Sequence, residues 1–209
     1  MAMVSGIREI RGLMEVSLDG VVWLRVRKKH FARRPLSAGD PVDPEAYIDS
    51  LAALQAADCY EAALTMLDRA AHSSGNLRAK LERAGYVSPA AEAAVARLQE
   101  NRLVDDRRYA ERIAQSQLNK ATGAYAVRSK LRAKHLSDED IDAAMEGFDD
   151  EQQSAACRSA AEKLWRKYAA LPAREGRAKL SQALARRGFG WDAIRSAVDA
   201  LGGDFDEYE

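Results

Sequence analysis

The chain has 209 residues, and its 32 basic and 32 acidic side chains give a formal net charge of zero at neutral pH. This balance excludes a histone-like polycation, and an apolar content of 47% excludes wholesale disorder. The length suits one ordinary domain or several small ones. Because the chain has neither an apolar run of the roughly 18 residues that span a membrane nor a signal-peptide pattern in residues 1–15, we expect a cytoplasmic protein without membrane contact.

Residues 1–44 differ in composition from the rest and are treated as an N-terminal extension. Asp19-Gly20, a dipeptide typical of tight turns, lies between two runs rich in β-branched and apolar residues, 15–18 and 21–26. This pattern predicts a short β-hairpin. Helical periodicity then begins near Asp43, with Pro44 at a position suited to the first turn of a helix.

The rest of the chain contains an internal repeat. Residues 77–98, 127–148 and 180–201 superpose without gaps and keep apolar residues at equivalent positions. Within each window these residues recur at steps of three and four, which indicates two helices separated by a break. A further helical stretch precedes each window, at 60–72, 107–119 and 151–171, so each unit is predicted to have three helices.

The breaks between the paired helices have recognisable end signals. Gly85 and Gly188 lie where a helix would end in a left-handed residue, and the second repeat has His135 there. The run from Ser137 to Asp140 resembles a capping box, whereas Gly190-Trp191 replaces a polar cap in the third repeat.

The predicted fold is therefore all-α, an elongated array of three tandem three-helix repeats with a short N-terminal β-hairpin extension. One such unit buries too little apolar surface to be stable alone, so neighbours are expected to stack or to be tied by short linkers. The expected boundaries are 1–44 for the extension, 45–104 for a linker helix with the first repeat, 105–150 and 151–203 for the other repeats, and 204–209 for an acidic tail.

The neutral total hides strong local segregation of charge. Residues 107–134 contain eight basic side chains and one acidic one, a balance of +7, whereas residues 137–151 contain eight acids and no base. A basic helix face can approach phosphates, although basic residues also occur on ordinary solvated helices. The candidate contact residues are Arg107, Arg108, Arg112, Arg128, Lys130, Arg132 and Lys134, followed by Lys163, Lys167, Arg186 and Arg187.

Catalytic and cofactor-binding patterns are absent from the sequence. There is no phosphate-binding glycine loop, and the three histidines are isolated, so we expect neither a metal nor another cofactor. Cys59 and Cys157 are interpreted as small core residues. The acids from Asp138 to Asp150 could hold magnesium in a nuclease, but acids at a helix start are common for capping reasons alone.

Residues 103–110, LVDDRRYA, resemble the L-x-D-D-x-x-[FY]-[AC] signature of the RecX family, small bacterial regulators of the RecA recombinase. The segments 83–86 and 186–189 resemble that family's [KR]-x-G-[FY] helix ends, and the resemblance covers about residues 60–201. It implies a non-enzymatic, all-helical protein of three-helix repeats. The signature matches Asp105, Asp106 and Tyr109, for which we expect structural roles: Asp106 would cap a helix beginning near Arg107, and Tyr109 would enter the core.

The resemblance further implies that the chain binds the RecA–DNA filament in its helical groove and depresses ATP hydrolysis and strand exchange in DNA repair. It also implies weak binding to single- and double-stranded DNA without sequence preference, and we expect a monomer. The alternative is a DNA-binding transcription regulator, because three-helix units can resemble helix-turn-helix modules. The last helix of each unit is alanine-rich or acidic, which is poorly suited to reading a major groove.

Overall fold

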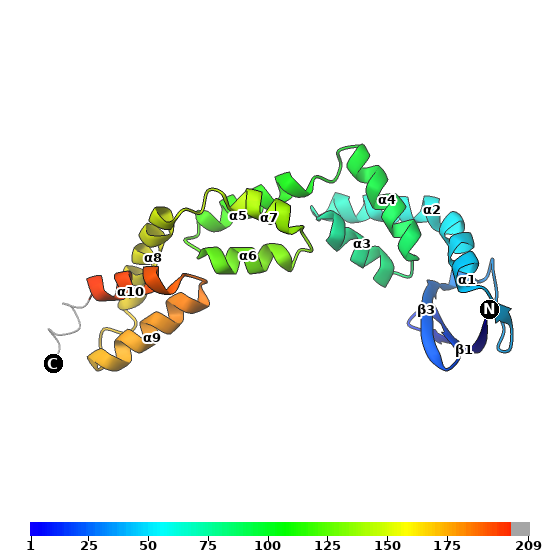
Figure 1. Cartoon of the computed structure of the whole chain (residues 1–209), viewed down its shortest axis with the longest axis horizontal. Coiled ribbons are helices and arrows are strands. Elements are labelled where there is room, and N and C mark those ends of the chain that lie inside the picture. The colour runs from blue at the N-terminus through cyan, green and yellow to red at the C-terminus, as the bar shows by residue number, and fades with distance from the viewer. Residues whose placement is uncertain (202–209) are drawn as a thin grey trace. The chain divides into compact units, whose positions relative to one another are not determined.

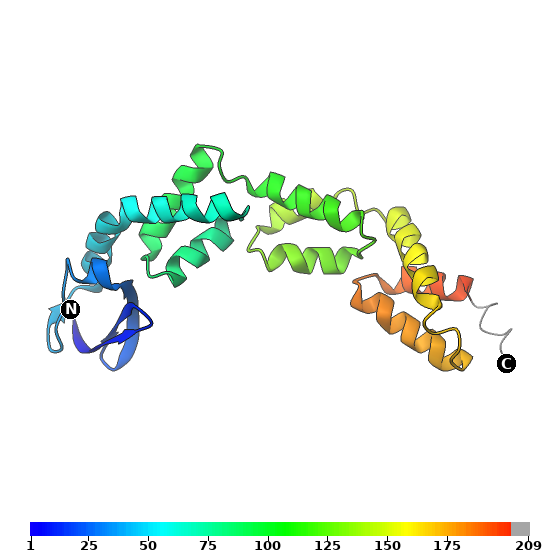
Figure 2. The same cartoon turned by 180° about the vertical axis from the view of Figure 1, so that it is seen from behind.

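The structure is a computed structural model that describes residues 1–201, so the expected acidic tail at 204–209 lies outside the described residues. It divides into two compact units, Met1–Asp105 and Asp106–Glu209, which are described separately. Figures 1 and 2 show a small sheet and helices in the first unit and helices alone in the second. Among the described residues, no helix combines the length and hydrophobicity that a bilayer crossing needs.

The N-terminal extension forms a four-stranded antiparallel sheet, not a hairpin alone. Its strands are β1 (Ala2–Ile10), β2 (Leu13–Leu18), β3 (Val21–Arg27) and β4 (Pro41–Val42), in the order β3-β2-β1-β4. The expected hairpin is β2–β3, and Asp19 and Gly20 both have positive φ, 48° and 84°. A second turn of the same kind, Arg11-Gly12 with φ of 49° and 80°, adds β1, so the sheet has more strands than the expected hairpin.

The first unit continues with α1 (Lys28–Phe31), α2 (Pro44–Arg69), α3 (Ser74–Arg83) and α4 (Ser88–Glu100). Asp43 caps α2, its carboxylate accepting hydrogen bonds from the backbone N–H groups of Glu45 at 3.1 Å and Ala46 at 3.3 Å. The expected linker helix and the expected helix at 60–72 are one continuous helix of 26 residues. No proline or glycine interrupts α2 after its first residue, which is why the two segments join.

The sheet and the first three-helix repeat share one hydrophobic core. Val16 and Val26 of the sheet belong to the same buried cluster as Leu51 of α2 and Leu77 of α3. Cys59 is also fully buried there, and this burial raises the pKa of its thiol to about 12. The extension is therefore part of the first unit's core.

The second unit contains two three-helix bundles. The first comprises α5 (Asp106–Leu118), α6 (Ala124–Arg132) and α7 (Asp138–Met145), packed around Leu131 and Ile141. The second comprises α8 (Asp150–Trp165), α9 (Ala173–Arg186) and α10 (Trp191–Ala200), packed around Leu184 and Ile194. Cys157 is fully buried in the second bundle, which raises the pKa of its thiol to about 11, so both cysteines are core residues as predicted.

The predicted helix ends are confirmed at the equivalent break of each repeat. Gly85, His135 and Gly188 have φ of +87°, +57° and +83°, so all three adopt the left-handed conformation. Ser137 caps α7 by accepting a hydrogen bond from the N–H of Asp140 at 3.1 Å. The helix expected at 151–171 ends earlier, at Trp165.

Candidate functional site

The candidate basic residues of the second repeat lie on two neighbouring helices. Arg107, Arg108 and Arg112 are exposed on α5, and Lys130 and Arg132 are exposed on α6. Arg128 on α6 and Lys134, two residues after α6, are half-buried. The α5 and α6 groups belong to one bundle, because both helices pack with α7 around the same core.

Two arginines of α6 form ion pairs with the acidic helix α7. Arg128 donates to Asp142, and the Arg132 guanidinium lies 3.4 Å from the Asp138 carboxylate. The basic and acidic stretches, which are separate along the sequence, are thus partly neutralised where they fold side by side. Lys130 is two residues from each arginine, a rotation of about 200° around the helix axis, so it lies on the side of α6 opposite these ion pairs.

The signature residues have structural positions, with one correction. Helix α5 begins at Asp106 itself, so Asp106 lies in the first turn and Asp105 immediately precedes the helix. A carboxylate in the first turn still interacts favourably with the helix dipole. Tyr109 is half-buried against the bundle core, and this burial raises the pKa of its hydroxyl. The Arg112 guanidinium lies 6.0 Å from the centre of the Tyr109 ring.

The acidic run serves helix ends and ion pairs. Ser137 donates to the Asp140 carboxylate at 2.6 Å, and Asp149 caps α8 by accepting from the N–H of Gln152 at 2.7 Å. Asp138 and Asp142 pair with arginines, as described above. In the part of the chain that the structure describes, no group of three or more histidine, cysteine or acidic side chains is arranged to hold a metal ion.

The third repeat contacts the N-terminal end of α6 directly. The N–H of Gly123 donates to the carbonyl of Arg187 at 2.9 Å, and the N–H of Tyr125 donates to the carbonyl of Gly188 at 3.1 Å. The intervening N–H of Ala124 donates to the side-chain oxygen of Gln153 at 2.8 Å. The carbonyl groups just after α9 therefore cap the first turn of α6, and they bring the negative end of the α9 dipole to the positive end of the α6 dipole.

The contact between the start of α6 and the end of α9, called the junction from here on, requires glycine on both sides, at Gly123 and Gly188. A Cβ on Gly123 would overlap the carbonyl group of Gly188, and a Cβ on Gly188 would overlap the backbone nitrogen of Ala126. This contact places the exposed residues Arg186 and Arg187 beside the start of α6. The second and third repeats thus bring two of the predicted basic groups to one junction.

The remaining candidates, Lys163 and Lys167, are exposed on α8 and just after it. Lys163 lines a shallow hollow of about 260 Å³ with Glu162 and Arg166. All three residues that line this hollow lie at the C-terminal end of α8 or at its C-cap, Arg166.

The sequence prediction missed two exposed aromatic residues at the junction, Tyr125 and Trp191. Tyr125 is 70% exposed at the start of α6, and Trp191 is 68% exposed at the start of α10. A signal was present: Tyr125 is followed at three and four residues by Arg128 and Ser129, so it lies off the apolar face of its helix.

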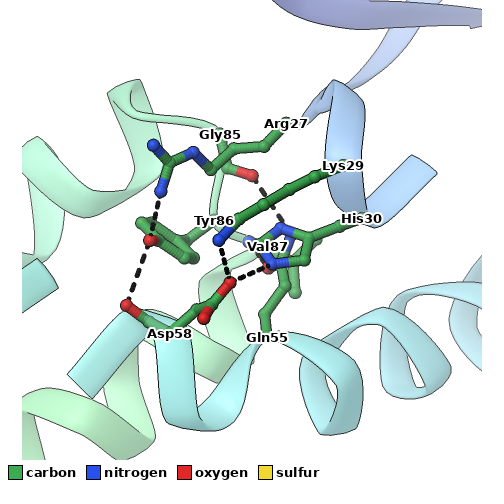
Figure 3. A network of polar contacts seen from close by, with 8 residues as sticks. All are labelled: Arg27, Lys29, His30, Gln55, Asp58, Gly85, Tyr86 and Val87. Atoms are coloured by element: carbon green, nitrogen blue, oxygen red, sulfur yellow. Dashed lines mark hydrogen bonds and ion pairs between the residues drawn. The ribbon is translucent and has the colours of Figure 1, made fainter. Parts of the chain in front are cut away.

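A polar network joins the sheet side of the first unit to its repeat (Figure 3). Buried His30 lies between Asp58, whose carboxylate is 2.8 Å from Nε2, and Gln55, whose Nε2 is 3.3 Å from Nδ1. Gln55 also donates to the carbonyl of Gly85 at 3.2 Å and accepts from the N–H of Val87 at 2.7 Å. The Nδ1 atom of His30 therefore faces an amide N–H₂ group, and its Nε2 atom faces a carboxylate.

The network continues to the surface of the first unit. Lys29 also pairs with Asp58, and Arg27 donates to the hydroxyl of Tyr86, which in turn donates to the backbone carbonyl of Asp58 at 3.1 Å. The Lys29 and His30 hydrogen bonds hold the pKa of Asp58 below its ordinary value. Sheet, α2 and the α3–α4 turn are thereby fixed to one another, which is a structural role (Figure 3).

A second charged cluster lies across three strands of the sheet. Glu15 of β2 is only 1% exposed and lies between Arg25 of β3, 2.8 Å away, and Arg8 of β1, 2.6 Å away. These two arginines hold the pKa of the Glu15 carboxyl below its ordinary value. The cluster adjoins an open groove of about 720 Å³, lined by Arg11, Arg25 and Arg83 over Ile10, Leu13 and Ala79, with Glu15 and Glu82.

Comparison with known proteins matches all three repeats. Family models described as the first, second and third three-helix domains of RecX match residues 59–98, 105–145 and 150–198. A crystal structure of regulatory protein RecX superposes with a TM-score of 0.63 at 27% identity, covering 95% of this chain and 100% of that one. A crystal structure of RecX from Lactobacillus salivarius has the same TM-score at 24% identity and supports the fold alone, over 71% of this chain and 97% of that one.

Curated relatives agree with these matches. A regulatory protein RecX of Chlorobaculum tepidum is 38% identical over 143 residues, which cover 68% of this chain and 87% of the relative. Another, of Stenotrophomonas maltophilia, is 36% identical over 138 residues, covering 65% of this chain and 82% of the relative. A third, of Limosilactobacillus reuteri, is 28% identical over 180 residues, covering 86% of this chain and 68% of the relative. With its three matched domains, the chain belongs to the RecX family of regulatory proteins.

Proposed function

We propose that the protein is a non-catalytic regulator of homologous recombination and DNA repair that binds the RecA–DNA filament and depresses its ATP hydrolysis and strand exchange. The observation that carries this proposal is the match of all three repeats to RecX three-helix domains. The relatives are named as regulatory proteins, which fits a role exerted through binding. The protein acts in the cytoplasm as a monomer and needs no cofactor.

The exposed basic side chains of the second unit are the proposed contacts with DNA phosphates or acidic filament surfaces. Support comes from their exposure on α5 and α6 and from the position of Arg186 and Arg187 beside the start of α6. The ion pairs with α7 leave Arg132 62% exposed, so a phosphate can still approach it. Binding to DNA alone is weak and independent of sequence, because the chain is neutral overall.

The proposal is tested by adding the purified protein to RecA, single-stranded DNA and ATP. We expect hydrolysis and strand exchange to fall as the protein is titrated. Unchanged rates at saturating protein would refute the regulatory role. The same titration without RecA measures any hydrolysis by the protein itself, for which we expect none.

Reversing the charges of Arg128, Lys130 and Arg132 together should weaken filament binding without unfolding the chain. Each reversed arginine replaces an exposed ion pair, which contributes about 0.2–1 kcal/mol, with a like-charge contact to α7, so circular dichroism checks that the variant is folded. The single variant Lys130→Glu is the sharper test, because it removes a cation without breaking either ion pair to α7. A matched control is Arg174→Glu, which reverses an exposed base of α9 outside the candidate contact residues. Equal filament affinity of the triple variant and the wild type would eliminate the α6 surface.

The alternative, a sequence-reading transcription regulator, is less well supported by the exposed side chains. The third helix of the second repeat, α7, exposes Asp138, Glu139 and Asp142, which would repel phosphates in a major groove. Binding of unrelated DNA sequences across a salt titration separates the two functions. Steep salt dependence without a preferred sequence supports the filament regulator, and a preferred site supports the alternative.

A further inference from the structure

Two aromatic side chains lie exposed beside the junction between the second and third repeats. The ring atom Cε2 of Tyr125 lies 3.6 Å from the position that a Cβ on Gly190 would occupy, and Gly190 directly precedes Trp191. The N–H of Tyr125 donates to Gly188, at the start of the same turn. Residues from α6 and α10 are therefore held near each other by backbone contacts that do not involve their side chains.

The exposure of these rings is unusual within their unit. In the described part of the second unit, Tyr125 and Trp191 are the exposed large hydrophobic residues, and both are aromatic. Protein interfaces are likewise enriched in tyrosine, tryptophan and arginine, but a docking site normally presents a contiguous apolar patch as well. Two rings without exposed aliphatic neighbours of comparable size fit a flat, π-bearing partner better than an apolar helix or loop.

The surroundings of the two rings are rich in arginine. Arg186 is the last residue of α9 and Arg187 is its C-cap. Arg128, which pairs with Asp142, follows Tyr125 by one helical turn, and Arg195 follows Trp191 by one turn on α10. The neighbouring acid, Asp192, lies in the first turn of α10, where the helix dipole favours it.

This combination of exposed rings and cations is the chemistry that binds single-stranded nucleic acid. Every base has a flat face that stacks on an aromatic ring, while the backbone phosphates require cations alongside. A duplex does not offer its base faces, because they are stacked on one another. The chemistry therefore selects a single strand over a duplex.

We propose that Tyr125 and Trp191 form a base-stacking platform for single-stranded DNA at the junction of the second and third repeats, with Arg186 and Arg187 at the backbone phosphates. This inference deepens the DNA contact in the proposed function and rests on it. It assigns the selectivity for strand type to rings that the basic-residue prediction did not include.

The test measures binding of the full-length chain to labelled oligo(dT) by fluorescence anisotropy, with an abasic oligonucleotide of the same length as a second probe. We expect Tyr125→Ala and Trp191→Ala each to weaken oligo(dT) binding about tenfold, the range that stacking on one ring provides. Neither should weaken abasic binding, which lacks bases. Wild-type protein should prefer oligo(dT) to the abasic strand, and the double variant should lose this preference.

Trp191 also supplies a direct signal. Of the three tryptophans, Trp23 and Trp165 are half-buried, so stacking on Trp191 should quench fluorescence in the wild type and not in Trp191→Phe. Folding of each variant is checked by circular dichroism, and Val22→Ala on the sheet serves as a control for loss of an exposed apolar side chain.

The inference is overturned if the wild type binds both probes equally, or if the double variant binds oligo(dT) as the wild type does. It is also overturned if the double variant loses affinity for the filament alone, because the rings would then contact protein. If the double variant loses its preference for oligo(dT) and still inhibits RecA, both the proposed function and the stacking platform are supported, and inhibition does not depend on the platform. If the wild-type protein does not inhibit RecA, the proposed function is refuted, and the oligo(dT) measurements still test the stacking platform.

Discussion

Glu15 illustrates how a single buried charge can be tolerated in a small sheet. Burying a carboxylate is costly unless it is paired, and here one arginine from each neighbouring strand pairs with it. The strand register places Arg8, Glu15 and Arg25 in one row across β1, β2 and β3. The same pairing makes this glutamate sensitive to acid.

Lowering the pH should therefore reduce the contribution of Glu15 to stability. The pKa of Glu15 is lower in the folded chain than in the unfolded chain, so its contribution is complete above the ordinary glutamate pKa and is lost as the pH falls toward the folded value. We expect Glu15→Gln to be less stable than the wild type at neutral pH, and the difference to shrink under acidic conditions. Urea unfolding of both proteins across pH measures this.

A difference that stays constant from neutral pH to below the ordinary glutamate range would contradict the lowered pKa. Glu9→Gln is a suitable control, because Glu9 pairs with Lys28 but is half-exposed. Its effect on stability should be small at every pH.

At the scale of elements, the helical repeats were predictable and much of the sheet was not. The apolar positions around Leu131 and Leu184 recur with helical spacing, and these residues are buried as that spacing predicts. Strand β1 has no such signal, because Ala2–Ile10 contains glycine, arginine and glutamate and few β-branched residues. Its place in the sheet depends on the Arg11-Gly12 turn and on pairing with distant residues, which local propensity does not report.

The sequence allowed the residues of the candidate site to be predicted, but not how these residues are arranged in space. The basic residues of α5 and α6 could be identified from the sequence, but the pairing of Arg128 and Arg132 with acids of α7 depends on how two helices pack. The contact of Gly123 with Gly188 joins residues 65 positions apart, and neither glycine alone indicates its partner. Tyr125 and Trp191 were missed because exposure is a tertiary property.

The glycine contact leads to a prediction about the second unit. Gly123→Ala should destabilise this unit by about 1–3 kcal/mol, because the new methyl group would overlap the Gly188 carbonyl with no room to relax. Gly188→Ala should cost more, since its φ of +83° adds the strain of a left-handed alanine, about 1–2 kcal/mol. Gly147→Ala is the matched control, because open space surrounds its Cβ position. Unfolding curves of the three variants test this, and equal stability of G123A and G147A would contradict the close contact.

At the scale of the whole molecule, the neutral net charge arises partly from internal pairing. The acidic stretch caps helices and pairs with arginines inside the second unit, so local excess charge along the sequence does not translate directly into an equally charged surface. A balance of 32 against 32 is therefore compatible with local basic groups on a folded surface. What the protein presents to a polyanion depends on individual side chains such as Lys130.

The two cysteines have a practical consequence, because each compact unit holds one of them and both are fully buried. Thiols with pKa values raised to about 12 and about 11 should resist alkylation while the chain is native. Pulsed alkylation in rising urea, followed by peptide mass spectrometry, would therefore measure the urea concentration at which each compact unit unfolds, and no engineered cysteine is needed. We expect Gly123→Ala to advance the labelling of Cys157 and to leave that of Cys59 unchanged; equal advances at both thiols would show that the two halves open together.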